Sequence, residues 1–142
     1  MTLKELSQLY YLNREIEMDQ QRLEELRAKA ESPQSPALTG MPGIVNAESR
    51  LERYVAEMVD LENIIKAKQD QCIYERNRLE RFIQDIDDSL TRQIFTLRCV
   101  NGLSWVEVAD CVGGGNTDLG AKQRFYRHLR NSRLEQSKLN RI

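Results

Sequence analysis

Aromatic residues and long apolar runs are both scarce in this chain of 142 residues. Only 6% of the residues are aromatic whereas 30% are charged, a balance that favours long solvated helices over a large globular core. No run of about 18 apolar residues occurs, so we expect no transmembrane helix. The N-terminal stretch MTLKELSQLYYLNREIE is too polar for a secretory signal peptide. The sequence therefore predicts no membrane partner.

Cysteine and histidine are also sparse. The three cysteines, Cys72, Cys99 and Cys111, form no CxxC pair, and their odd number argues against a disulfide framework. His128, the single histidine, has no cysteine or carboxylate at metal-ligand spacing, and we expect it at the surface or facing a groove. No Ser/His/Asp or Cys/His nucleophile arrangement occurs. We expect a reduced, cytoplasmic protein that is not an enzyme and has no metal and no cofactor.

All three prolines lie in one stretch, SPQSPALTGMPG, from Ser32 to Gly43. Proline removes a backbone donor and disfavours helix in the residue before it. We interpret residues 32–46 as a linker, which is long beside the roughly 4–6 residues of an ordinary connection.

Seven-residue apolar repeats lie on both sides of this linker. Residues 1–31 form the first predicted helix, and its repeat consists of Leu9, Ile16, Leu23 and Ala30. Leu12 and Leu26 add a second row, which Asp19 interrupts. Residues 47–88 form a longer helix, whose stripe consists of Leu51, Met58, Ile65, Cys72, Leu79 and Ile86, widened by Val55, Leu61, Ile73, Phe82 and Ile83. Such a seam needs a partner.

Two partners suit the long helix. The first helix can fold back on it as an antiparallel hairpin, or a second copy of the chain can pair with it. The two pairings are compatible, and we expect a homodimer through the long helices.

The stretch DIDDSL follows, and it contains Asp85, Asp87 and Asp88. Carboxylates suit Mg²⁺ or Ca²⁺, but no glycine turn or second ligand cluster accompanies them. Asp88 or Ser89 is instead a good N-cap for a new helix, and this role is the one we expect.

Residues 89–142 have the pattern of a helix-turn-helix domain. A helix is predicted from Leu90 to Val100, with Ile94, Leu97 and Cys99 facing inward. Ser104 and Glu107 form a capping-box pattern at the start of a short helix, Trp105 to Val112. Three glycines, 113–115, end it. Asn116 or Thr117 then caps a helix from Asp118 to beyond Leu134, with Ala121, Phe125 and Leu129 inward.

The charge is unevenly distributed. Residues 116–142 hold seven Lys/Arg against two Asp/Glu, a net charge of +5, whereas the rest of the chain carries −6. A basic end on an acidic body suits contact with a polyanion such as double-stranded DNA. The predicted DNA-binding residues are Asn116, Thr117, Lys122, Gln123, Arg124, Arg127 and Arg130. The alternative is that these residues form an ordinary solvated helix face.

The glycine run does not fit a nucleotide-binding loop. A dinucleotide fingerprint that begins at Gly113 would need its third glycine at position 118, which is Asp118. A phosphate loop would need G-K-[ST], which is absent, and the preceding segment has a helical pattern.

The stretch IFTLRCVNGLSWVEVADCVGGGNTDLGAKQRFYRHL resembles region four of bacterial sigma factors. It is more similar still to small phage transcriptional regulators of Gram-positive hosts, relatives of late-operon activators. These also carry a stretch like LTGMPG, here Leu38 to Gly43, between an N-terminal helix and a long second helix. The chain departs from the sigma pattern at Gly120, Asp118 and Ala121. The resemblance implies an all-α fold with a long helical hairpin or coiled-coil part, then a sigma region-four-like helix-turn-helix.

The resemblance also implies a function. We expect a sequence-specific regulator of phage or prophage transcription in the cytoplasm of a bacterial host, with RNA polymerase as a further partner. Two alternatives stay open: a protein-interaction module that docks on RNA polymerase or a sigma factor, and a DNA-packaging subunit like the small terminase.

Overall fold

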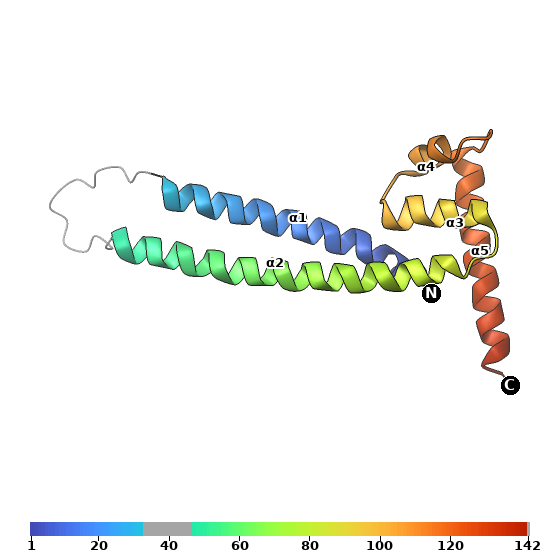
Figure 1. Ribbon diagram of the computed structural model, residues 1–142, viewed down its shortest axis with the longest axis horizontal. Helices are drawn as coiled ribbons and strands as arrows, with labels where there is room; N and C mark the ends of the chain where they lie inside the picture. Colours follow the sequence, from blue (N-terminus) through green and yellow to red (C-terminus); the bar gives the residue numbers. More distant parts are fainter. Residues whose placement is uncertain (33–46, 142) are drawn as a thin grey trace. The chain divides into compact units, whose positions relative to one another are not determined.

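The computed structural model describes residues 1–32 and 47–141. Within them the chain forms α1 (Leu3–Glu31), α2 (Ala47–Gln84), α3 (Ser89–Phe95), a π-helical turn (Thr96–Val100), α4 (Trp105–Val112) and α5 (Asp118–Leu139) (Figure 1). These described residues contain no strand, so the fold is all-α as predicted. The predicted linker, with its LTGMPG stretch, lies outside them except for Ser32. Over the described ranges, no helix combines the length and apolar character needed to span a membrane.

The chain divides into two compact units. One unit consists of Arg14–Gln71, the facing parts of the two long helices. The other consists of Met1–Asn13 and the chain from Cys72 onward, which contains α3, α4 and α5.

In the unit 14–71, α1 and α2 run antiparallel, side by side (Figure 1). Their seam buries Ile16, Leu23, Leu26, Leu61 and Ile65, all of them positions that the heptad pattern predicts. Asp19 interrupts one apolar row of α1, and a lysine of α2 pairs with it: Lys68 Nζ lies 2.5 Å from the Asp19 carboxylate. This hydrogen bond raises the pKa of Lys68. Asp19 is therefore an ion-paired residue within an otherwise apolar seam.

Three residues of the predicted stripe are exposed. Leu51 and Val55 on α2 remain 47% and 45% exposed, and in the other unit Ile73 is 60% exposed. Within a single chain, α1 therefore leaves these three positions of the stripe uncovered. The stripe is wider than the surface that α1 covers, because one helix can bury only a narrow seam of its neighbour.

In the second unit, the start of α1 and the end of α2 pack with α3, α4 and α5 around one hydrophobic core. This core consists of Leu6, Leu9, Leu79, Ile83, Ile86, Ile94, Phe95, Cys99, Val108, Ala121, Phe125 and Leu129. Arg78 of α2 reaches Glu5 of α1 at 2.6 Å. The pKa of Glu5 falls to about 2, first because its carboxylate accepts the Thr2 backbone N–H and then because of Arg78.

Two helix boundaries differ from the predicted ones. The long helix ends at Gln84 rather than at residue 88, and Ile86 donates its N–H to the Ile83 carbonyl in a closing turn. The helix predicted from Leu90 to Val100 is an α-helix only to Phe95 and continues as a π-helical turn. There the Asn101 N–H bonds five residues back to the Thr96 carbonyl, a wider winding that periodicity does not reveal.

Candidate nucleic-acid interface

The short helix α4 begins and ends where its sequence predicts. The Ser104 hydroxyl oxygen accepts the Glu107 N–H at 3.3 Å, and the hydroxyl donates to the Glu107 carboxylate at 2.9 Å. The two side chains of the capping-box pattern therefore meet, although the hydroxyl takes the place of the Ser104 backbone N–H as donor to the carboxylate. Val108 and Ala109 are buried, which fixes the inner face of α4 against α5.

The three glycines form the turn between α4 and α5. All have positive φ: 66° at Gly113, 63° at Gly114 and 78° at Gly115. Residues other than glycine rarely adopt these φ values, so the conformation of the turn explains why three glycines occur in a row. The Asn116 side chain closes the turn by donating its amide to the Gly113 carbonyl at 2.8 Å.

Helix α5 begins directly after this turn. Thr117 is its N-cap, and its hydroxyl accepts the Gly120 N–H at 3.0 Å. A side chain at Gly120 would meet that hydroxyl at 3.1 Å, so the local cap already accounts for a glycine at this position. The structure thus gives the side chains of Asn116 and Thr117, both predicted to bind DNA, local roles at the start of the helix.

One face of α5 packs into the hydrophobic core. Ala121, Phe125 and Leu129 are buried, as their four-residue spacing predicts. The Phe125 ring lies 4.4 Å from the Phe95 ring and 5.2 Å from that of Trp105, measured between centroids. This packing holds the helix at a fixed rotation, so its outer residues are presented in a fixed direction.

The outer face forms a basic groove of about 470 Å³. We use the name basic groove for the surface lined by Leu119, Lys122, Gln123, Tyr126, Arg127 and Arg130. Four of its six residues are among those predicted to bind DNA. Their spacing of three and four residues places them along one side of the helix, away from the buried face.

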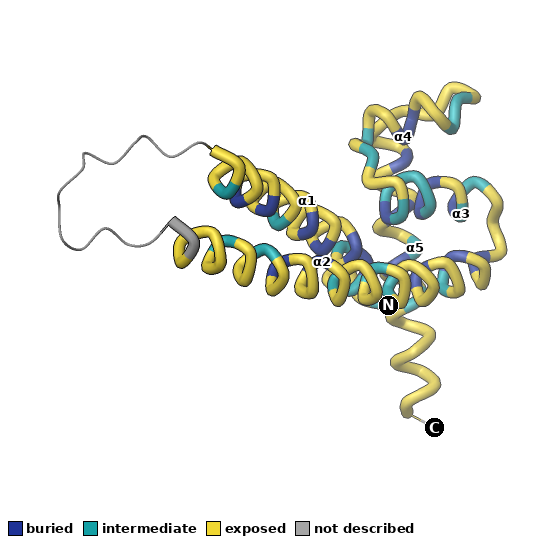
Figure 2. Tube along the Cα trace, turned by 60° about the vertical axis from the view of Figure 1, so that its left-hand side comes forward, coloured by how far each residue is buried: buried dark blue, intermediate teal, exposed yellow. Residues whose placement is uncertain are grey.

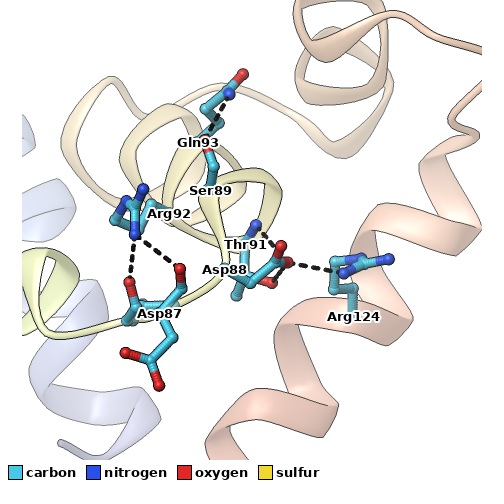
Figure 3. A network of polar contacts seen from close by, with 8 residues as sticks. Asp87, Asp88, Ser89, Thr91, Arg92, Gln93 and Arg124 are labelled. Atoms are coloured by element: carbon cyan, nitrogen blue, oxygen red, sulfur yellow. Dashed lines mark hydrogen bonds and ion pairs between the residues drawn. The ribbon is translucent and has the colours of Figure 1, made fainter.

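Arg124 is separated from this groove. Its guanidinium Nη1 lies 2.8 Å from the carboxylate of Asp88, the residue that caps α3 (Figure 3). Asp88 also accepts the N–H and the hydroxyl of Thr91, at 3.1 and 2.6 Å. These contacts, the Thr91 bonds foremost, lower the pKa of Asp88. The predicted cap is therefore confirmed at Asp88, and Arg124 turns toward α3.

Beside this pair, Arg92 of α3 bonds to the preceding turn. Its guanidinium donates to the carbonyls of Ile86 and Asp87, at 2.7 and 3.0 Å (Figure 3). The stretch DIDDSL thus uses its polar groups to join α2 to α3. No cluster of three or more His, Cys, Asp or Glu side chains suited to a metal occurs in residues 1–32 and 47–141.

His128, expected at the surface or facing a groove, is only partly exposed. Its ring is partly buried and lies edge-on to Phe95 at 5.3 Å and to Phe82 at 6.3 Å. Burial lowers its pKa. Position 128 borders the buried stripe of α5, and residues of neighbouring helices therefore cover part of its ring.

Two residues of the basic groove, Leu119 and Tyr126, were not among the predicted DNA-binding residues. Leu119 lies four residues before Gln123, and Tyr126 lies four residues before Arg130. That spacing was the available signal, because it assigns them to the side of the helix opposite Ala121 and Phe125.

Comparison with protein families, with characterised proteins and with solved structures finds no match to this chain. The function must therefore be inferred from the residues of the interface and from the elements that hold them.

Proposed function

We propose that the chain is a sequence-specific DNA-binding transcriptional regulator in which α4, the glycine turn and α5 form a helix-turn-helix. The basic groove carries this proposal. It gathers Lys122, Arg127 and Arg130 with Gln123 on the exposed side of a helix whose opposite side is fixed in a core. A helix of about 10–12 Å diameter fits a major groove about 12 Å wide.

Several properties of α5 support a role on DNA. Its first residues follow the short glycine turn, as in helix-turn-helix proteins whose recognition-helix N-terminal residues contact base edges. Lysine and arginine further along match the phosphate backbone in charge and reach. The C-terminal part of α5, from Glu135 to Leu139, is exposed throughout (Figure 2), which leaves Lys138 accessible to a polyanion.

The resemblance to sigma region four and to phage regulators extends the proposal. We infer that the regulated genes belong to a phage or prophage, that RNA polymerase is a further partner and that the protein acts in the cytoplasm of a bacterial host. Two features of the chain support this: the order of its motifs and the agreement of α4 and α5 with the boundaries expected for a helix-turn-helix.

The test is duplex binding as a function of salt. Wild-type protein should bind duplex DNA at low salt, with a log–log slope of about −0.9 for each phosphate neutralised. The double variant Lys122→Glu, Arg127→Glu should lose this binding. The control, Arg22→Glu with Lys66→Glu, makes the same charge change on the exposed sides of α1 and α2 and should retain it. Absence of wild-type binding, with helicity intact by circular dichroism, would contradict the proposal.

A second candidate function, a protein-binding module, is favoured by a pocket of about 390 Å³. Five of the nine aromatic residues line it: Tyr10, Tyr11, Trp105, Phe125 and Tyr126. The Arg98 guanidinium lies 4.7 Å from the centre of the Trp105 ring. Tryptophan, tyrosine and arginine are the residues that dominate binding energy at protein interfaces.

Mutations distinguish DNA binding from protein binding. Tyr11 is exposed and lines this aromatic pocket. If RNA polymerase docks there, Tyr11→Ser weakens polymerase capture and leaves duplex binding unchanged, whereas Lys122→Glu with Arg127→Glu does the reverse. Polymerase capture that is indifferent to Tyr11→Ser would contradict the second function.

We also infer a homodimer through the long helices, because Leu51 and Val55 of the heptad stripe are about half exposed in a single chain. A second copy that covers them would complete the predicted seam. Sedimentation equilibrium should give twice the chain mass of 16.6 kDa, and Leu51→Ser with Val55→Ser should give the monomer. A monomeric wild-type protein would contradict this inference, and a large ring would favour the packaging alternative.

A further inference from the structure

Leu119 is an unusual residue for the surface on which it lies. It occupies the first turn of α5, is 61% exposed and lines the basic groove. Every other residue of this groove ends in a charged or hydrogen-bonding group. On a solvated face a leucine contributes only helix propensity, whereas an apolar ligand group would also give its side chain a packing partner.

The residue one turn further along has a complementary character. Gln123 is exposed, lines the same groove and is four residues from Leu119, so the two side chains are neighbours on the helix. A primary amide offers a donor and an acceptor on two adjacent atoms of one planar group. The first two turns of α5 therefore present one apolar group beside one donor–acceptor pair.

The major groove of DNA has a matching pair of features. The thymine C5 methyl is the apolar group exposed there, and adenine offers the N7 acceptor together with the N6 amino donor. Glutamine bonds to these two adenine atoms in a bidentate manner, and apolar side chains contact the thymine methyl. Residues at the start of an inserted helix are the ones that reach base edges.

We propose that Leu119 and Gln123 are the specificity-determining residues of the interface and that they select A·T base pairs, with Leu119 against a thymine methyl and Gln123 against adenine N6 and N7. Lys122, Arg127 and Arg130 then contact phosphates, which fix the position of the helix without reading sequence. This inference rests on the proposed function, since it assumes that the basic groove enters the major groove.

Atomic substitutions in the DNA test it directly. Duplexes are first selected from a random pool with the full-length wild-type chain. In a selected duplex, each thymine is then replaced by deoxyuridine, which lacks the C5 methyl, and each adenine by 7-deazaadenine, which lacks the N7 acceptor. Affinity for each duplex is measured at one salt concentration by fluorescence anisotropy.

We expect at least one thymine at which deoxyuridine weakens wild-type binding about fourfold, which is ~0.8 kcal/mol per buried CH₂ group converted at ~1.4 kcal/mol per tenfold. We also expect an adenine at which 7-deazaadenine weakens binding about fivefold or more. Leu119→Ala should abolish the first effect alone and Gln123→Ala the second alone.

Leu134→Ala is the matched control. Leu134 is also 61% exposed on α5, about four helical turns beyond Leu119, and it lies outside the basic groove. This variant should keep the sensitivity of the wild type to both replacements.

Three outcomes would count against these ideas, and they are distinguishable. If no duplex is enriched, the proposed function fails. If duplexes are enriched but wild-type binding is indifferent to both replacements, the assignment to A·T pairs is overturned while the proposed function stands. If Leu119→Ala and Leu134→Ala respond alike, Leu119 has no part in reading the bases.

Discussion

The guanidinium of Arg124 lies 2.8 Å from the carboxylate of Asp88, across 36 residues of sequence. Asp88 is also the N-cap of α3, and its carboxylate accepts the Thr91 N–H. One carboxylate therefore fixes the start of α3 and connects it to the second turn of α5. Arg124 is thereby a positioning residue, whereas Arg127, one turn of the helix away from it, lines the basic groove.

This difference predicts unequal effects on DNA binding. Arg127→Gln should reduce the magnitude of the log–log salt slope by about 0.9, the value for one phosphate contact. Arg124→Gln should leave the slope unchanged, because its charge faces α3. Titrations of both variants at several salt concentrations check this. Equal loss of slope in the two would show that Arg124 leaves Asp88 when DNA binds.

The position of His128 predicts a dependence of stability on pH. Its pKa is below 6.5 in the folded chain because its ring is partly buried against Phe82 and Phe95. Below pH 6.5 the unfolded chain takes up a proton there before the folded chain does. The free energy of unfolding should therefore fall as the pH drops below about 6.5. This fall should end once the pH is below the pKa of His128 in the folded chain.

The check is urea unfolding at a series of pH values between about 7 and 5. His128→Gln has no titrating group at this position, so its stability should change less over this range. Two other groups face the His128 ring: Glu135, whose charge raises the pKa of His128, and the Ser132 hydroxyl. The lowered pKa values of Asp88 and Glu5 place the titration of both carboxyls below this range. Parallel curves for wild type and variant would contradict the prediction.

Phe125 predicts how strongly α5 depends on its core. It is 2% exposed and packs between the rings of Phe95 and Trp105. Phe125→Ala should lower the free energy of unfolding by about 3–5 kcal/mol, since it removes a large side chain and leaves a cavity. Leu119→Ala, an exposed position on the same helix, should change it by no more than about 0.5 kcal/mol.

The emission of Trp105, the single tryptophan, reports this transition because the partly buried indole packs against Phe125 and the core. Urea unfolding monitored at Trp105 therefore measures the unit that contains α3, α4 and α5. A cost below about 1 kcal/mol for Phe125→Ala would mean that α5 is held by contacts other than this aromatic cluster.

Gly113 predicts a cost that arises from the backbone alone. Its φ of 66° and ψ of −152° lie in a region that is essentially restricted to glycine. A Cβ added there would meet no atom within 4 Å, so Gly113→Ala should destabilise by about 1–3 kcal/mol through strain. Cys111→Ala, at an exposed site on α4, is the control. Equal melting temperatures for the two variants would contradict this explanation.

The start and end of α4 and the start of α5 were predictable because the signals for them are local. Ser104 and Thr117 cap their helices through bonds to residues three positions on. The glycines between them are required by three consecutive positive φ values. Apolar residues four apart identified the buried side of α5 in the same way, because a helix repeats its faces every 3.6 residues.

The positions of His128 and Arg124 were not predictable by such means. The burial of His128 depends on Phe82 and Phe95, which belong to other helices. The pairing of Arg124 depends on a carboxylate 36 residues earlier. Nothing in the spacing of residues along α5 distinguishes Arg124 from Arg127 as a contact of DNA, since both are basic and exposed.

The sequence by itself determined an all-α chain, with two long heptad-patterned helices followed by shorter capped ones, because hydrophobic period and capping residues act over a few positions. Only the tertiary structure decided how Asp19 is compensated, since Lys68 approaches it from 49 residues away. It also decided which basic residues of α5 face outward together. Packing of Phe125 against α3 and α4 sets the rotation of that helix, and this rotation assigns Arg124 to Asp88 and leaves Leu119 and Gln123 in the basic groove.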